Sequence, residues 1–235
     1  MASATLTREG ECPGSIGAPG GMDTVVLDVD GTLLDSNYHH VIAWSRAFEG
    51  IGVRVVAWRI HRAIGMGGDR LVAAVAGDDV EQDHGSEIRE AWEKEYDSLI
   101  DEVHLLPGAR ALLDAIRHRG VTPVLASSSI PKHAQRAFEL LDADRRAGSA
   151  TTAEDAEESK PDPELIEEAI ERVRGSEACV IGDSVWDVEA AHRAGVPAYG
   201  VLSGGNARGD LMDAGARDVY ADPADLLTHI DAWLT

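Results

Sequence analysis

Two aspartates two positions apart, Asp28 and Asp30, directly follow the apolar run Val25–Leu27 and precede Gly31. Carboxylates this close repel each other, so the pair requires a cation, a shared proton or open solvent. At the end of a strand, Asp28 is placed to attack phosphorus. Asp30 can give a proton to the departing alkoxide and later take one from water. Asp and Gly are also ordinary turn residues after a strand, so the pair needs support from elsewhere in the chain.

Candidate substrate contacts follow two of the predicted strands. After the first, Gly31 lets the chain turn sharply and brings backbone N–H groups near phosphoryl oxygens, and Thr32 is expected beside it. After the second, Ser127 can donate its hydroxyl to a non-bridging phosphoryl oxygen, with Ser128 expected in the same substrate site. The serines also suit a turn or a helix N-cap before Pro131, and the sequence leaves both interpretations open.

A lysine between acidic residues and prolines is the candidate cation. The lysines of the chain are Lys94, Lys132 and Lys160, and two prolines stiffen the segment Glu157–Pro163 that carries Lys160. A fixed ammonium at this position can pair with Asp28 and offset the charge on a transferring phosphoryl group. The alternative is a solvated, charged loop.

A second pair of aspartates, Asp183 and Asp187, stands at the start of a predicted helix after the apolar run Val180-Ile181. Four residues apart, their side chains share one helix face. Acidic residues at this position also cap helices. The functional interpretation is a Mg²⁺ site, because Mg²⁺ prefers a few carboxylates together with water and substrate phosphate.

An alternation of strands and helices positions these four segments. Helical patterns separate the predicted strands, which are Thr24–Val29, Val121–Ala126, Ala178–Ile181, Ala198–Val201 and Val219–Ala221. The alternation predicts an α/β fold with a Rossmann-like, three-layer core in which helices cover both faces of a parallel sheet. Ligands bind such sheets at the carboxyl ends of the strands, so we expect the side chains after the first three strands to meet in one crevice.

The sequence predicts three parts. Residues 1–21 lack the apolar stretch of a signal peptide and form a predicted flexible tail, which makes Met22 a candidate natural start. Residues 22–36 and 107–235 form the predicted catalytic core. Residues 37–106 carry helical patterns, with a break predicted at residues 77–79, and form a helical cap inserted after the first strand.

Composition narrows the choice of partners. Of 235 residues, 44% are hydrophobic and 27% charged, and the formal net charge is −21. That charge opposes binding to nucleic acid or to anionic lipid, so neither is expected as a partner. A site for a small phosphorylated metabolite then requires a local cation. No apolar run is long enough to span a membrane, Cys12 and Cys179 are too few for a disulfide framework, and the expected compartment is the cytoplasm.

From Thr24 to the C-terminus the motifs resemble the haloacid dehalogenase superfamily, in the branch of phosphoglycolate phosphatases and β-phosphoglucomutases with a helical cap. The resemblance implies that Asp28 is the nucleophile and Asp30 the general acid/base, with Ser127 and Lys160 holding phosphate. It also implies Mg²⁺ bound by Asp28, the Asp30 backbone carbonyl and Asp183, with support from Asp187. The implied activity is hydrolysis of a small phosphate monoester, phosphoglycolate-like or sugar-phosphate-like, through an aspartyl-phosphate.

Other activities of that superfamily fit less well. Dehalogenases lack the second carboxylate that Asp30 supplies, and phosphonatases use a cap lysine unlike Lys94. A mutase stays open, because His40 stands at the position of a mutase histidine. The cap arginine of the mutases falls at Gly68, however, with Arg70 or Arg62 as substitutes. His40 and Arg70 are therefore predicted substrate contacts. A non-catalytic protein that binds a phosphate ligand is the remaining alternative.

Overall fold

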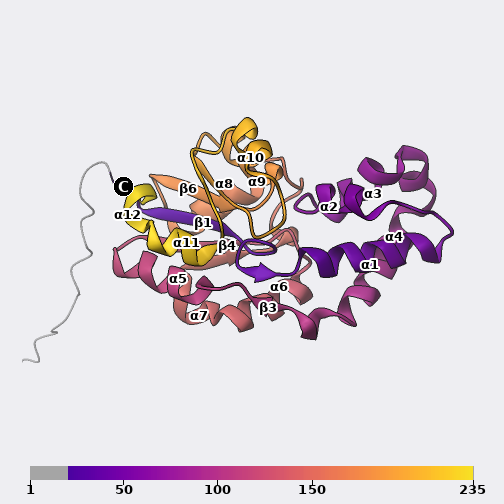
Figure 1. The fold of residues 1–235 in the computed structure, drawn as a ribbon, viewed down its shortest axis with the longest axis horizontal. Helices are drawn as coiled ribbons and strands as arrows, with labels where there is room; N and C mark the ends of the chain where they lie inside the picture. The colour runs from indigo at the N-terminus through magenta and orange to yellow at the C-terminus, as the bar shows by residue number, and fades with distance from the viewer. Residues whose placement is uncertain (1–20, 235) are drawn as a thin grey trace, which may run out of the picture.

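The structure, a computed structural model, describes residues 21–234. The predicted tail lies outside these residues except for Gly21, and so does Cys12. Figure 1 shows the chain arranged in two parts, with a sheet and its helices on one side and the helices α1 to α4 on the other. The sheet part holds both the first and the last of the described segments, because the helical part is inserted near the start of the chain.

Six parallel strands form the central sheet, in the order β5-β4-β1-β6-β7-β8. Their bounds are β1 Thr24–Asp28, β4 Thr122–Ala126, β5 Ser149–Thr151, β6 Ala178–Gly182, β7 Ala198–Val201 and β8 Val219–Tyr220. The α/β fold with a parallel sheet is therefore confirmed. The sequence did not predict β5, which consists of three small residues. It pairs with the inner strand β4 in parallel from Val124↔Ser149 to Ala126↔Thr151.

The carboxyl ends of three strands lie next to one another at the centre of this sheet. β1 pairs with β4 up to Asp28↔Ala126, and with β6 up to Leu27↔Ile181. The chain fills the sheet on one side of β1 and then crosses to the other side, which makes this the switch point of the strand order. Residues that follow β1, β4 and β6 consequently emerge at one edge, as the sequence predicted.

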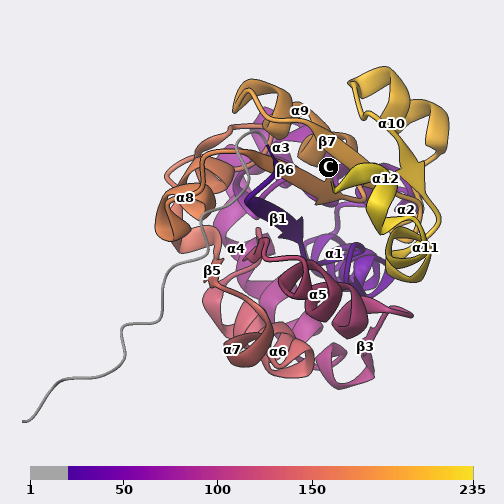
Figure 2. The same ribbon diagram turned by 90° about the vertical axis from the view of Figure 1, so that its left-hand side faces the viewer.

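Each face of the sheet buries its own apolar cluster, because successive side chains of a strand point to opposite faces. Val25 and Leu27 of β1 belong to one cluster, and Val26 to the other. Figure 2 shows the sheet between two groups of helices. The helices of the core are α5 Ala109–His118, α6 Pro131–Leu141, α7 Ala143–Arg146, α8 Glu164–Val173, α9 Val185–Arg193, α10 Arg208–Ala214, α11 Pro223–Thr228 and α12 Ile230–Trp233.

The inserted segment is helical, and we call it the cap. It contains α1 Asn37–Gly50, α2 Ala57–Ala63, α3 Gly68–Ala76, α4 Asp78–Asp97 and a 3₁₀ turn at Ile100–Glu102. The predicted break at residues 77–79 is wrong beyond Gly77. Helix α4 begins at Asp78, because Asp78, Asp79 and Glu81 place negative charge at the positive end of the helix dipole.

A short antiparallel pair of strands closes the base of the cap. β2 (Leu34–Asp35) pairs with β3 (His104–Leu105) through Leu34↔Leu105 and Asp35↔His104. The two chain crossings between cap and core are therefore hydrogen-bonded to each other. The division of the chain at residues 36 and 106 stays a prediction, although this pair of strands lies at both proposed boundaries.

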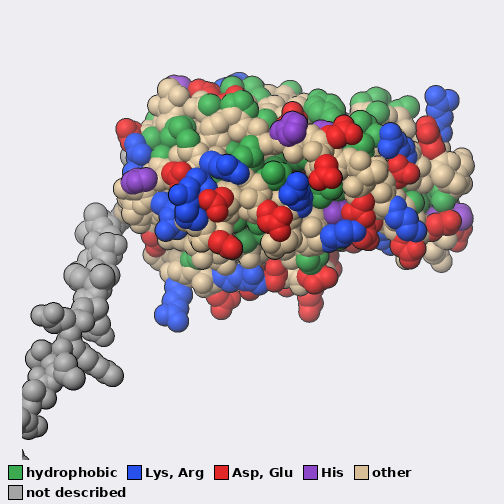
Figure 3. Space-filling model, turned by 90° about the horizontal axis from the view of Figure 1, so that it is seen from below, with side chains coloured by type: hydrophobic (Ala, Val, Ile, Leu, Met, Phe, Trp, Pro, Cys, Tyr) green, Lys and Arg blue, Asp and Glu red, His purple; other side chains and the backbone are tan. Residues whose placement is uncertain are grey.

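The surface is charged with both signs. On the face shown in Figure 3, acidic and basic side chains are interspersed with apolar ones, and no continuous basic patch covers it. Over the whole sequence the acidic residues prevail, with a formal net charge of −21. As for membranes, the helices within residues 21–234 are too short or too polar for any of them to span a bilayer.

Candidate active site

A buried ammonium joins two carboxylates at the centre of the sheet edge. Lys160 Nζ lies 2.6 Å from Asp28 Oδ1 and 2.7 Å from Asp187 Oδ1. The Lys160 side chain is 2% exposed, and Asp28 and Asp187 are buried too. Lys160 comes from the loop between β5 and α8, Asp28 ends β1, and Asp187 lies in the first turn of α9. The solvated-loop interpretation of Lys160 is therefore wrong.

A third carboxylate, Asp183, follows β6 in the same place. The Thr32 hydroxyl donates to Asp28 Oδ2 at 3.1 Å and approaches Asp183 Oδ1 at 3.4 Å. Asn37 Nδ2 donates to Asp183 Oδ2 at 2.9 Å. Thr32, predicted to contact substrate, thus bridges two acids of the protein in this structure. Below, "the carboxylate cluster" means Asp28, Lys160, Asp183 and Asp187.

The electrostatics of the carboxylate cluster are unbalanced, with three buried acids against one ammonium. Burial raises the pKa of Asp28 to about 7, against the opposing effect of Lys160. Burial, together with the neighbouring Asp28 and Asp187, raises the pKa of Asp183 well above its usual range. Burial opposes the charge on Lys160, but the Asp187 and Asp28 carboxylates outweigh it, so the pKa of Lys160 is raised. The ammonium stays charged, and once all three acids are ionised they carry a surplus of negative charge.

This surplus fits a divalent cation. Asp28, Asp183 and Asp187 each present an oxygen such that all three lie within 4.8 Å of one another, and all three residues are buried. Buried carboxylates in this arrangement are the donor set that Mg²⁺ prefers, and a cation would remove their mutual repulsion. The residues present therefore fit the group.

The oxygens of Asp187 already have partners. Oδ1 pairs with Lys160, and Oδ2 accepts hydrogen bonds from the Ser184 backbone N–H at 3.0 Å and hydroxyl at 2.6 Å. Asp187 and Ser184 form a capping box at the start of α9, so the capping and functional interpretations of Asp187 hold together. Asp187 accordingly positions Lys160.

Asp30 lies in different surroundings, although it is only two residues from Asp28. Its Oδ1 accepts from the Ser36 hydroxyl at 2.6 Å and lies 3.3 Å from His40 Nε2, and its Oδ2 accepts from the Ser129 hydroxyl at 2.9 Å. Burial favours the neutral acid, but His40, Ser36 and Ser129 together outweigh burial and lower the pKa of Asp30. Asp30, Ser36, His40 and Ser129 are called "the cap-side group" below.

Aromatic side chains of the cap hold His40 in place. Its ring stacks on Tyr96 at 3.9 Å between centroids and faces Trp92 at 5.8 Å. Trp92 in turn stacks on Trp44 at 4.9 Å. His40 is buried, and it faces Asp30 from the first turn of α1. His40 was predicted to contact substrate, and in this structure its polar partner is Asp30.

Ser127, Ser128 and Gly31 lie around the same edge of the sheet. Ser127 is fully buried, and its hydroxyl oxygen accepts from the Ser129 backbone N–H at 3.2 Å. Ser128 lines a cavity next to Asp28 and Asp30. Gly31 has φ +77°, and its own N–H donates to the Leu34 carbonyl at 2.8 Å. The Gly31 N–H is therefore already hydrogen-bonded within the protein, and the role of Gly31 is to allow the turn.

Arg70 does not join the site. Its guanidinium forms an ion pair with Glu158 and lies 3.9 Å from Asp69, while Ser159, just before Lys160, hydrogen-bonds to Asp69. Arg70 is not among the residues that line the cavity beside Asp28. The prediction that it binds substrate is not supported, because two nearby acids hold its charge at the outer edge of the interface between cap and core.

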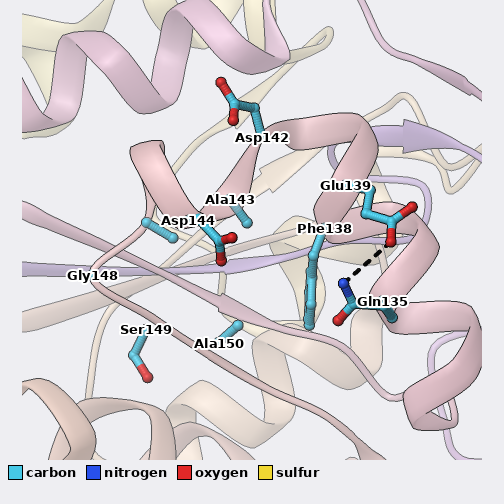
Figure 4. Close-up of a pocket in the computed structure, with 10 residues that line it drawn as sticks. Gln135, Phe138, Glu139, Asp142, Ala143, Asp144, Gly148, Ser149 and Ala150 are labelled. Atoms are coloured by element: carbon cyan, nitrogen blue, oxygen red, sulfur yellow. Dashed lines mark hydrogen bonds between the residues drawn. The ribbon is translucent and has the colours of Figure 1, made fainter.

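A larger cavity elsewhere in the fold lacks the residues of the carboxylate cluster and of the cap-side group. It measures about 500 Å³ and lies beside α6, α7 and β5. Figure 4 shows Phe138 and Ala150 in it, together with Glu139, which hydrogen-bonds to Gln135. None of the motif residues lines it. Volume is therefore a poor guide here, and the converging side chains locate the site at the smaller cavity.

Sequence reasoning missed several residues that support the acids. Asn37 and Ser36 belong to the linker after the first motif, where substrate contacts were expected, and Ser129 is the third serine after β4. Gly204 lies in the loop after β7, where a Cβ would come 1.7 Å from Asp183 Oδ2. The signal for Gly204 was its place after a core strand, since every such loop reaches the same edge.

The family model for haloacid dehalogenase-like hydrolases matches residues 22–195. The chain belongs to this family. Among curated relatives, a phosphoglycolate phosphatase of Vibrio parahaemolyticus is 26% identical over 218 residues, covering 88% of this chain and 95% of its own. A phosphorylated carbohydrates phosphatase of Thermotoga maritima is 27% identical over 203 residues, covering 83% of this chain and 92% of its own.

A solved structure of a hydrolase from Pseudomonas syringae superposes on this hydrolase with a TM-score of 0.86 and 33% sequence identity. The match covers 91% of this chain and all of that chain. Family and fold thus agree with the resemblance found in the motifs, and phosphatase-named relatives support a phosphatase as the enzyme class.

Proposed function

We propose that this hydrolase is a Mg²⁺-dependent phosphatase that cleaves a small phosphate monoester through an aspartyl-phosphate on Asp28. The observation that carries the proposal is the buried bridge from Asp28 through Lys160 to Asp187, beside Asp183. A buried ammonium is costly unless it is paired, and Lys160 is paired here with Asp28. Asp28 lies at the end of a strand, where its carboxylate can attack phosphorus. The expected compartment, the cytoplasm, stays a prediction from composition.

In this mechanism Asp28 attacks phosphorus and the alcohol leaves, which splits one hard displacement into two easier ones. Lys160 binds Asp28 Oδ1 at 2.6 Å, so it fixes the rotamer of the nucleophile and sits where it can offset phosphoryl charge. Asp28 and Asp183 would hold Mg²⁺, which when bound would supply charge neutralisation for phosphoryl transfer. Ser127 is the proposed phosphate contact from β4.

Asp30 is the proposed acid and base. The lowered pKa holds it as a carboxylate in this structure, the form that takes a proton from water during hydrolysis of the aspartyl-phosphate. As an acid for the leaving alkoxide it must first gain a proton. His40 Nε2, 3.3 Å from Asp30 Oδ1, lies within reach of this carboxylate. His40 is thus a proposed positioning residue for Asp30 instead of a substrate contact.

The two alternatives have less support. A sugar-phosphate mutase has to hold a second phosphate, but no Lys or Arg is among the residues that line the cavity beside Asp28 and Asp30. A non-catalytic phosphate sensor does not require Asp30, yet three donors position that carboxylate beside the cavity. Hydrolysis accounts for both carboxylates.

The test is phosphate release from p-nitrophenyl phosphate by the full chain, with and without Mg²⁺. The proposal predicts turnover that requires Mg²⁺ and disappears in Asp28→Asn. Asp35→Asn is a matched control, because Asp35 is an exposed aspartate of the same segment. Turnover by Asp28→Asn at the wild-type rate would refute the proposed nucleophile, and turnover unaffected by a chelator would refute the metal dependence.

A further inference from the structure

The cavity beside Asp28 has an unusual lining for a site that handles phosphate esters. It measures about 50 Å³, which is room for a few waters or a small organic group. Apart from the two aspartates, His40, Ser128 and Ser129, its walls are aromatic and apolar. The lining residues of this kind are Trp44, Ile64, Met66, Leu71 and Trp92, with Gly65 and Gly68 between them. The alcohol part of a substrate bound at Asp28 would lie against these walls.

No Lys or Arg is among the residues that line this cavity. The ionisable residues that line it are Asp28, Asp30 and His40, and His40 is already paired with Asp30. Arg89 of α4 comes near through the Gly68 carbonyl, but Glu81 holds it with contacts of 2.8 and 2.9 Å. A carboxylate or a second phosphate on the alcohol would therefore be desolvated next to Asp30 without a partner, which is unfavourable.

Two neutral hydrogen-bonding groups beside the cavity have no partner. The Ser128 hydroxyl and the Trp92 indole N–H are buried with no hydrogen-bond partner among the described residues. Both residues line the cavity. A buried donor without a partner is costly in a folded protein, so a ligand that offers a neutral oxygen to these groups would relieve the cost.

We propose that the cavity selects phosphate monoesters whose alcohol is short, uncharged and hydroxylated, and that the Trp92 indole N–H donates to the hydroxyl of that alcohol. The inference rests on the proposed phosphatase function and narrows its substrate class. It separates this hydrolase from an enzyme whose substrate carries a carboxylate, and it favours small polyol phosphates and the esters of simple diols.

The first test uses two esters of equal length, 2-hydroxyethyl phosphate and 2-phosphoglycolate, which differ by a hydroxymethyl group against a carboxylate. The expected result is a kcat/KM at least about tenfold higher for 2-hydroxyethyl phosphate, because the carboxylate lacks a cation in the cavity. Hydrolysis of p-nitrophenyl phosphate is measured in parallel and reports the proposed function separately.

The outcomes are distinguishable. If p-nitrophenyl phosphate is hydrolysed and 2-phosphoglycolate equals or exceeds 2-hydroxyethyl phosphate, the inference is overturned while the proposed function stands. Turnover of neither two-carbon ester, with p-nitrophenyl phosphate hydrolysed, overturns the inference as well. If none of the esters is hydrolysed, the proposed function and the inference fail together.

The second test addresses the Trp92 donor. Trp92→Phe removes the indole N–H and keeps an aromatic ring, and Trp58→Phe makes the same change at an exposed tryptophan outside the cavity. The ratio of kcat/KM for 2-hydroxyethyl phosphate to that for ethyl phosphate should fall about fivefold in Trp92→Phe, the value of one neutral hydrogen bond, and stay level in Trp58→Phe. The ratio does not depend on the fraction of enzyme that is folded. An unchanged ratio in Trp92→Phe would overturn the assignment of the donor.

Discussion

Two groups of residues meet at the end of β1, and they shift the pKa values of Asp28 and Asp30 in opposite directions. In the carboxylate cluster, Asp28 is buried among other acids, and burial raises its pKa to about 7 in spite of Lys160. In the cap-side group, Asp30 accepts from Ser36 and Ser129 and faces His40, and its pKa is lowered. The raised pKa of Asp28 reflects acids crowded around one ammonium, a repulsion that a bound cation would relieve, whereas the donors around Asp30 already stabilise its charge.

Different elements of the fold supply the partners of Asp28 and of Asp30. The partners of Asp28 come from the loops after core strands, so the rigid sheet holds them in register. The partners of Asp30 include Ser36 and His40 from the linker and the first cap helix. In the proposed mechanism, attack at phosphorus would therefore depend on loops of the core, whereas proton transfer at Asp30 would also depend on Ser36 and His40 at the start of the cap.

Asp28→Asn is expected to have the largest effect, because the carbonyl of an amide is a poor nucleophile. Turnover should fall by about four orders of magnitude or more. Steady-state release of phosphate measures it, with Asp35→Asn as the control. If Asp28→Asn lost no more turnover than Asp30→Asn, the proposed division of roles between the two aspartates would be contradicted.

Asp30→Asn should be less severe. Loss of general acid/base catalysis should lower kcat by about 10²- to 10⁴-fold. Calorimetric Mg²⁺ affinity should change little, because the Asp30 carboxylate has its partners in the cap-side group. A large loss of Mg²⁺ affinity in this variant would assign Asp30 to the carboxylate cluster instead.

Lys160→Met should destabilise the fold as well as stop turnover. It leaves Asp28 and Asp187 buried without their shared cation, which is expected to cost about 3–5 kcal/mol of the free energy of unfolding. Lys132→Met is the matched control, since Lys132 pairs with Asp97 on the surface and should cost about 1 kcal/mol or less. Urea unfolding without Mg²⁺ compares them. Equal costs would contradict the special position of Lys160.

A smaller effect is the pH dependence of stability in a chelating buffer. The folded Asp28 carboxyl keeps its proton up to about pH 7, whereas the unfolded one loses it near 3.8. Between these values the folded state binds more protons, so a rise in pH destabilises the metal-free wild type. Asn cannot titrate, so the stability of Asp28→Asn should rise relative to wild type across this window. A difference that stays constant with pH would contradict the raised pKa.

The sequence predicted the residues of the carboxylate cluster better than it predicted the partners of Asp30. That Asp28, Lys160, Asp183 and Asp187 come together was predictable, because parallel strands bring the residues that follow them to one edge of the sheet. The strands themselves followed from apolar, β-branched runs. β5 was not predictable in this way, because its residues Ser149–Thr151 carry no such pattern.

The partners of Asp30 were harder to find. Ser36 and Ser129 are small polar residues in loops, a setting in which serine is common for many reasons, and only the fold brings them within 3 Å of one carboxylate. Arg70 was assigned to the substrate because a cation was expected in the cap. Its pairing with Glu158, a residue far away in the sequence, depends on how cap and core pack.

The most direct test of the central claim, that Asp28 is the nucleophile of a phosphoryl-transfer site, is to quench the enzyme in acid during turnover of p-nitrophenyl phosphate with Mg²⁺ and map its peptides by mass spectrometry. The account predicts one added phosphoryl group on the peptide that contains Asp28, removable by hydroxylamine and missing in Asp28→Asn. A phosphoryl group on any other residue, or the same label in Asp28→Asn, would contradict it.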